Sequence, residues 1–180
     1  MILRGEKVIL RYPEMSDAKW LFEHITVPEV AKGLGPQIMK LKKLSQEKKW
    51  IKSLPKSRRK KETLNFTIVD KKTKKLIGAC GFNKFNFDEK FAVVGWWIAK
   101  EYWGQGYMVD AAKTLLKYGF NNLKLHRLEA EIHGDNPRSL GLAKKLGFKL
   151  EGTKREGHYH KGKFEAMWIV GLLKKEAKFL

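Results

Sequence analysis

The chain has 180 residues, of which 43% are hydrophobic and 12% aromatic, and this composition excludes a disordered protein. A chain of this length can bury a sizeable core, so we expect residues 1–180 to form a single domain. The one cysteine, Cys80, excludes an intramolecular disulfide and a cysteine-based zinc site, and its apolar neighbours indicate a small core residue. No apolar run is long enough to span a bilayer, and the first residues lack the apolar segment of a signal peptide. We therefore expect a cytoplasmic protein with no membrane partner.

The 38 Lys and Arg residues outnumber the 19 Asp and Glu residues, which gives a formal net charge of +19. Such a charge attracts anions, whether nucleic acid, acidic protein or a polyphosphate cofactor. The densest basic patch spans residues 56–61, and we interpret it as a solvated loop. The chain contains no aromatic RNP pattern, zinc knuckle or suitable Gly-x-x-Gly loop, so a nucleic-acid-binding module is a weaker alternative than an enzyme.

The N-terminal third alternates between strand and helix patterns. Residues 7–12 have the pattern of a strand, and a helix follows from a Ser-Asp cap at residue 16 to residue 25. The Gly-Leu-Gly-Pro sequence predicts irregular structure over residues 33–41. A short helix is expected over about residues 45–54.

The remainder predicts a sheet with helices on it. Three antiparallel strands are expected first, and a broad apolar stripe at helical spacing then predicts a helix. A further strand, a helix started by Asn136-Pro137 and ended by Gly147, and two closing strands complete the pattern. The order predicts an α+β fold with a central mixed, mostly antiparallel sheet. The expected strands are 64–68, 75–82, 91–99, 128–132, 148–152 and 164–173, and the expected helices are 108–119 and 136–147.

A glycine-rich loop joins the third central strand to the long helix. It contains Gly104 and Gly106 and opens directly onto the helix. Backbone N–H groups at a helix N-terminus, unobstructed at glycines, form a cradle that suits a pyrophosphate. A Gly-x-Gly sequence before a helix is also compatible with a simple tight turn.

The sequence Trp103-Gly-Gln-Gly-Tyr107, with an Ala-rich helix after it, resembles motif A of the GNAT superfamily of N-acetyltransferases. The resemblance continues with Asn136-Pro-Arg-Ser139 and Leu146-Gly-Phe148, and it includes the opening Leu10-Arg11 strand. It therefore covers nearly the whole chain, and it is closest to the group that acetylates the N-terminal alanine or serine of ribosomal proteins.

The resemblance implies that acetyl-CoA is the cosubstrate and that no metal takes part. It also implies that the strand backbone at Trp97 and Ile98 pairs with the pantetheine arm, and that Asn136 contacts the cofactor from the other side. Met108 stands where the family usually has Gly or Ala, and Trp103 where many members have Arg or Gln. The residues expected to hold the pyrophosphate are Trp103, Gly104, Gln105, Gly106, Tyr107, Met108 and Val109.

Acetyl transfer to an amine needs a base for the ammonium, a donor for the developing oxyanion and a proton for the departing thiolate. The Ile98 region is the candidate donor. The tyrosine that many relatives use as the acid is replaced by Ala143, and the resemblance to the ribosomal-protein group assigns this role to Ser139. Glu156 and His158 are the candidate bases. His158 and His160 form an i, i+2 pair, which without a third ligand indicates exposed loop histidines rather than a metal site.

The expected acceptor is the N-terminal amine of a protein, with a ribosomal protein as the preferred class and ribosome association as a possible context. A polyamine or another small amine is the alternative. A monomer and a homodimer are both compatible with the sequence.

Overall fold

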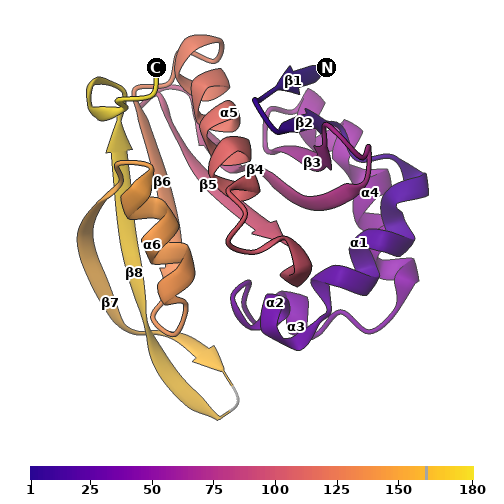
Figure 1. Ribbon diagram of the computed structural model, residues 1–180. Helices are drawn as coiled ribbons and strands as arrows, with labels where there is room; N and C mark the ends of the chain where they lie inside the picture. Colours follow the sequence, from indigo (N-terminus) through magenta and orange to yellow (C-terminus); the bar gives the residue numbers. More distant parts are fainter. Residues whose placement is uncertain (161) are drawn as a thin grey trace.

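The computed structural model describes residues 1–160 and 162–180, and for His160 it describes the backbone alone. The described chain forms an eight-stranded sheet of order β1-β2-β3-β4-β5-β6-β8-β7, flanked by helices on both faces (Figure 1). The strands are β1 (Ile2–Arg4), β2 (Val8–Arg11), β3 (Leu64–Asp70), β4 (Leu76–Asn86), β5 (Phe91–Ile98), β6 (Arg127–His133), β7 (Lys149–His160) and β8 (Lys163–Leu173). The helices are α1 (Ala18–Ile25), α2 (Pro28–Lys32), α3 (Pro36–Met39), α4 (Leu44–Arg59), α5 (Tyr107–Asn121) and α6 (Pro137–Lys145), with 3-10 turns η1 (Met15–Asp17), η2 (Lys100–Tyr102) and η3 (Lys174–Glu176). The predicted α+β fold, with its mixed and mostly antiparallel sheet, is confirmed.

The two faces of the sheet carry different helices. Cys80 and Phe82 belong to the main core, which includes the buried side of α5 and residues of α6. Ala79 points to the other face, where it packs with Ile51 of α4 and Leu21 of α1. The helices α1 and α4 therefore cover one face, and α5 and α6 the other. Within the described residues no helix is long and apolar enough to cross a membrane.

The sheet opens between its two central parallel strands. β5 pairs with β6 at three positions, Phe91–Val93 against Arg127–Glu129. Beyond Val93 the strands diverge, because β5 continues to Ile98 along β4 while β6 follows β8. The last part of β5 therefore has one edge without a strand partner, and backbone groups on such an edge can pair with an extended ligand.

Three local predictions were wrong. The stretch 33–41 contains the one-turn helix α3, because Gly35 takes the left-handed region (φ 92°) and Pro36 then occupies the first helical position. The basic patch is not a loop, since α4 runs through Pro55 to Arg59. β7 extends to His160 rather than ending near residue 152, which places Glu156 and His158 in a strand instead of a loop. Cys80 is buried as predicted, and burial raises the pKa of its thiol.

Candidate active site

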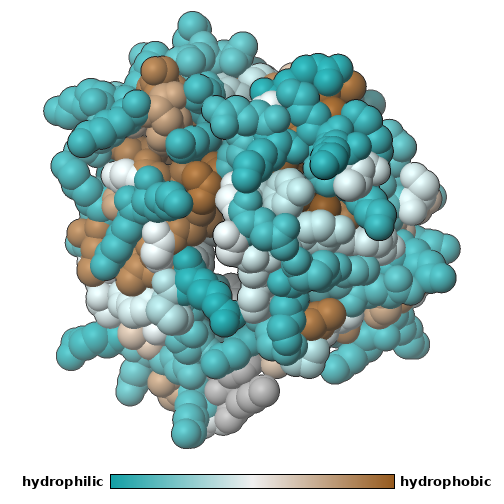
Figure 2. Space-filling model, viewed as in Figure 1, coloured by the Kyte–Doolittle hydropathy of each residue, from teal (hydrophilic) through white to brown (hydrophobic). Residues whose placement is uncertain are grey.

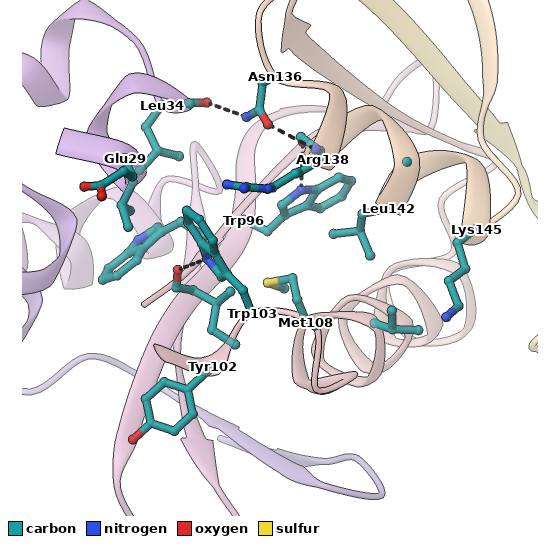
Figure 3. Close-up of a pocket in the computed structure, with 18 of the residues that line it drawn as sticks. Glu29, Leu34, Trp96, Tyr102, Trp103, Met108, Asn136, Arg138, Leu142 and Lys145 are labelled. Carbon is teal, nitrogen blue, oxygen red and sulfur yellow. Dashed lines mark hydrogen bonds between the residues drawn. The ribbon is translucent and has the colours of Figure 1, made fainter. Parts of the chain in front are cut away.

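A pocket of about 550 Å³ lies where β5 leaves β6. Its walls come from the end of β5, the loop before α5, the exposed side of α6 and the segment around α2 (Figure 3). On the face that carries α5 and α6, hydrophobic surface gathers beside these helices, while the rest is largely hydrophilic (Figure 2). The predicted residues that line the pocket are Trp97, Ile98, Trp103, Gly104, Gly106, Met108, Val109, Asn136 and Ser139.

The backbone of β5 presents hydrogen-bonding groups to this pocket. The N–H of Ala99 donates to the Ile77 carbonyl at 2.9 Å, so Ala99 faces β4. Because N–H and C=O directions alternate along a strand, the backbone groups of Trp96 and Ile98 face the open edge. Those of Trp97 face β4, so the predicted pairing of the Trp97 backbone with the pantetheine arm is wrong. The indole Nε1 of Trp103 donates to the Ile98 carbonyl at 3.0 Å, so this carbonyl already has a partner. The Ile98 N–H points to the same edge and can meet a ligand.

The loop before α5 has the backbone geometry of an anion cradle. Gly104 (φ 75°) and Gly106 (φ 81°) both take the left-handed conformation, and Gly106 is the N-cap of α5. A Cβ on Gly104 would have no atom within 4 Å, so this part of the loop faces open space. The first N–H groups of α5 have no intrahelical partner and are available to an anion.

A carboxylate ties this loop to the N-terminal hairpin. Asp110, in the first turn of α5, accepts hydrogen bonds from the backbone N–H groups of Glu6, Lys7 and Val8 at 2.7–3.0 Å. The Lys7 ammonium donates to the carbonyl of Gln105 at 3.0 Å. These contacts fix the cradle against β2 before any ligand binds.

The start of α6 places Ser139 at the pocket wall. Asn136 is the N-cap, and its Oδ1 accepts from the Ser139 N–H at 3.1 Å. Capping is therefore done by Asn136, and the Ser139 hydroxyl is not needed for it. Trp96 Nε1 donates to Ser139 Oγ at 3.2 Å, and this contact does not use the hydroxyl proton of Ser139.

The segment around α2 bridges the two sides of the opening. Glu29 forms an ion pair with Lys100, just after β5, and this contact lowers the pKa of Glu29. At its other end, Lys32 pairs with Asp135 at 3.2 Å. Asn136 Nδ2 also donates to the Gly33 carbonyl at 3.3 Å (Figure 3). The segment thus closes one end of the pocket.

Two histidines lie beside this segment. The rings of His133 and His158 are 3.8 Å apart between centroids in an edge-to-face arrangement, and His158 is 7% exposed. A Cβ on Gly35 would lie 3.1 Å from His133 Nε2 and 3.8 Å from His158 Cε1. Glu165 is the cross-strand partner of His158, and one of its carboxylate oxygens is buried without a hydrogen bond to any residue that the structure describes. Among the described residues, no group of three His, Cys, Asp or Glu side chains could hold a metal ion.

The structure separates some predicted site residues from the pocket, and His158, a predicted base, is among those that do not line it. Gln105 and Tyr107 line a neighbouring open pocket with Lys7 and Lys71, and Gln105 Nε2 donates to the Glu101 carbonyl. Glu156 is exposed at a bulge in β7, with φ 52° and no hydrogen bond or ion pair to a described residue. The side chain of His160 lies outside the described residues.

Sequence reasoning missed several pocket residues. Arg138 stacks its guanidinium on the Trp103 ring at 4.4 Å and so joins α6 to the loop before α5. Trp96 was also missed, because strand alternation alone does not distinguish an open edge from a paired one. His133, which lies outside the pocket against His158, was missed as well. Their positions in the sequence could have indicated them, because Trp96 directly precedes the predicted Trp97 and Ile98, and His133 precedes Asn136 by three residues.

An open strand edge, a glycine cradle and a polar helix start are together typical of an acetyltransferase. The family model for the acetyltransferase (GNAT) domain matches residues 7–149. The chain therefore belongs to the GNAT acetyltransferase family.

Relatives and solved structures agree with this assignment. The chain is 32% identical over 174 residues to an uncharacterized N-acetyltransferase, p20, from Bacillus licheniformis, with 97% of each chain covered. It is 31% identical over 88 residues to the ribosomal-protein-serine acetyltransferase of Escherichia coli, and this match covers 49% of each chain. It is 33% identical over 67 residues to the spermidine N(1)-acetyltransferase of the same organism, and this match covers 37% of this chain and 36% of the relative. The ribosomal-protein-S5-alanine acetyltransferase from Vibrio fischeri has the same fold, with a TM-score of 0.85, 23% identity and 99% of both chains covered.

Proposed function

We propose that this enzyme uses acetyl-CoA to acetylate the N-terminal amine of a protein, with ribosomal proteins as the acceptor class, and that it works in the cytoplasm. The observation that carries the proposal is the open edge of β5 beside the Gly104–Gly106 cradle. One relative is named a ribosomal-protein-serine acetyltransferase and another a spermidine acetyltransferase, so these are the two acceptor classes that we weigh.

The pocket fits acetyl-CoA in shape and in donor set. The backbone of Trp96 would pair with the pantetheine arm, as an added strand pairs with a sheet edge, while the Ile98 carbonyl is already occupied by Trp103. The N-terminal N–H groups of α5 would hold the pyrophosphate, aided by the helix dipole. Arg138 and Lys145 at the pocket wall add positive charge on the α6 side. When bound, acetyl-CoA supplies the activated acyl group.

The chain's own groups would then stabilise the transfer. The Ile98 N–H would donate to the acetyl oxygen as it becomes negative during attack. Ser139 would donate its proton to the departing thiolate, and its oxygen already accepts from Trp96. Holding Ser139 by Asn136 and Trp96 limits the motion that this proton transfer would otherwise require.

The proton acceptor for the amine is assigned to His158, with His133 against it. Ile132 points into the core with α5 and α6, so His133 points to the other face of β6. The pair therefore lies on the side of the opening away from the cofactor helices, next to the Gly33–Gly35 wall. An acceptor entering from that side would reach the histidines before it reached β5. Glu156 is a weaker candidate, since it is exposed at the bulge.

Local charges favour a peptide amine over a polyamine. Glu29, the carboxylate that lines the pocket, is already paired with Lys100, and Glu101 beside it in sequence contacts His24 at 3.4 Å. A polyamine carries several positive charges and needs free carboxylates to overcome a net charge of +19. A peptide N-terminus loses its single charge before attack.

The test is acetyl transfer to short peptides beginning Ala, Ser or Met, with thiol release and mass spectrometry to locate the acetyl group. The proposal predicts label on the α-amine that depends on both the peptide and acetyl-CoA. Thiol release with no peptide modified, while spermidine or another small amine is modified instead, would refute the acceptor class and leave the polyamine alternative.

A further inference from the structure

Half of the net charge of the chain is concentrated in one segment. Residues 42–61 contain ten Lys and Arg residues and one acidic residue, Glu47, which gives a formal +9 of the total +19. This segment comprises α4 and its immediate flanks. The proposed acetyl transfer makes no use of it.

The helix separates its buried and charged sides completely. Glu47, Ile51 and Leu54 form the buried stripe, and Arg58 covers the ring of Tyr12 at 3.8 Å. The other basic side chains are exposed, and we call them the α4 basic face. Its members are Lys42, Lys43, Lys48, Lys49, Lys52, Lys56, Arg59, Lys60 and Lys61.

Little negative charge offsets the α4 basic face. Among the described residues, the α4 basic face has one ion pair, between Lys60 and Glu62 at 3.7 Å. Glu47 lies on the buried side, and burial raises the pKa of its carboxyl to about 7, so this group carries a reduced charge at neutral pH. The face is therefore positive over its whole length.

We propose that the α4 basic face is a docking surface for RNA and that it binds the phosphate backbone. The 16 residues of α4 span about 24 Å, and Lys48, Lys52, Lys56 and Arg59 succeed one another by about one turn. Such a row meets several phosphates of one strand at once, which is the usual source of sequence-independent affinity for nucleic acid.

RNA fits this face better than an acidic protein. Protein interfaces are depleted in lysine and depend on apolar or aromatic anchors that become fully buried. The α4 basic face is nearly all lysine, and its one large exposed apolar side chain is Trp50, 37% exposed. A single exposed indole among lysines suits stacking on an unpaired base. The choice of RNA over DNA rests on the proposed function, which places the acceptor on the ribosome.

The face is separate from the acetyl-CoA pocket. α4 packs on the sheet face that carries α1, and the pocket opens beside α5 and α6 (Figure 1). RNA on α4 and acetyl-CoA in the pocket therefore need not compete. The two kinds of binding can be measured independently.

The experiment is fluorescence anisotropy of a labelled single-stranded RNA of about 20 nucleotides with the full chain, at 50 and 200 mM salt. Four phosphate contacts predict an affinity loss of about 50-fold over this range. The triple variant Lys48→Glu, Lys52→Glu, Lys56→Glu should weaken RNA binding at least tenfold. The matched control Lys117→Glu, Lys175→Glu, Lys178→Glu makes the same change in net charge at exposed lysines elsewhere and should stay within threefold of the parent.

Calorimetry with acetyl-CoA shows that both variants are folded with an intact pocket. Equal losses of RNA affinity in the two triple variants would overturn the proposal, because net charge alone would then explain binding. Tighter binding of an acidic peptide or of duplex DNA than of RNA would also overturn it. Peptide acetylation by the isolated enzyme needs no RNA, so its failure would refute the proposed function while leaving the anisotropy result in place.

Discussion

At the scale of single residues, the first turn of α6 contains one residue that caps the helix and another whose hydroxyl faces the pocket. Asn136 caps the helix, and Ser139 keeps its hydroxyl proton while its oxygen accepts from Trp96. Ser139→Ala should therefore lower kcat by about 10–1000-fold with a smaller change in KM, because a proton donor to the thiolate acts mainly in the transition state. The melting temperature should change little. An unchanged kcat in the folded variant would reduce Ser139 to a wall residue.

The glycine cradle gives a prediction about binding alone. A Cβ on Gly106 would have only the flexible Lys7 ammonium near it, at 3.4 Å, but the left-handed φ of 81° strains any side chain there, so the two variants compared must share this strain. Gly106→Asp places a carboxylate against the expected pyrophosphate and should weaken acetyl-CoA binding at least tenfold. Gly106→Asn has the same shape without the charge and should lose much less. Parent-like affinity of the Asp variant in calorimetry would show that the pyrophosphate lies elsewhere.

At the scale of elements, the buried side of α4 gives a prediction about pH. Burial raises the pKa of Glu47 to about 7, so ionisation is easier in the unfolded chain than in the folded one. The protein should lose stability relative to Glu47→Gln as pH rises from about 4.5 to about 7, by about 2–3 kcal/mol in total. Urea unfolding of both proteins at pH 5 and pH 8 measures this difference. A stability difference that does not change with pH would contradict a buried, unpaired carboxyl.

The elements also show what sequence patterns can predict. The central strands and α5 were predicted from the period and length of their apolar patterns, because each of these elements buries an apolar face. The same reasoning failed at Pro36 and Pro55. Pro36 was taken to prevent helix but starts one, and Pro55 lies inside a helix that tertiary packing of Ile51 and Leu54 sustains. Helix ends depend on such packing, which a local pattern does not contain.

The candidate site was predictable to a similar degree. The glycine cradle and Ser139 were predicted from the motif spacing of a resembling family. Gly104, Gly106 and Ser139 all line the pocket. Arg138, His133 and Glu165 were not predicted, since each acquires its place from a contact between distant segments. The burial of His158 depends in the same way on β7 extending far beyond its apolar part.

At the scale of the whole molecule, the charge of +19 bears on the choice of acceptor. It opposes the approach of a polycation and favours anionic partners, acetyl-CoA among them. The ion pair of Glu29 with Lys100 engages one carboxylate of the pocket wall that a polyamine would otherwise use. Raising the salt concentration from 50 to 200 mM should therefore help any residual activity on spermidine and leave activity on a neutral peptide amine nearly unchanged.

The most direct test of the central claim compares kcat/KM for acetyl transfer from acetyl-CoA to spermidine and to short peptides beginning Ala, Ser or Met. Thiol release measured under identical conditions gives both constants. We predict that at least one peptide exceeds spermidine by tenfold or more, because spermidine keeps other ammonium groups when its reacting amine is neutral, whereas such a peptide keeps no cationic charge and needs no carboxylate site. A tenfold advantage of spermidine over every peptide would contradict the assignment of a protein N-terminus as acceptor.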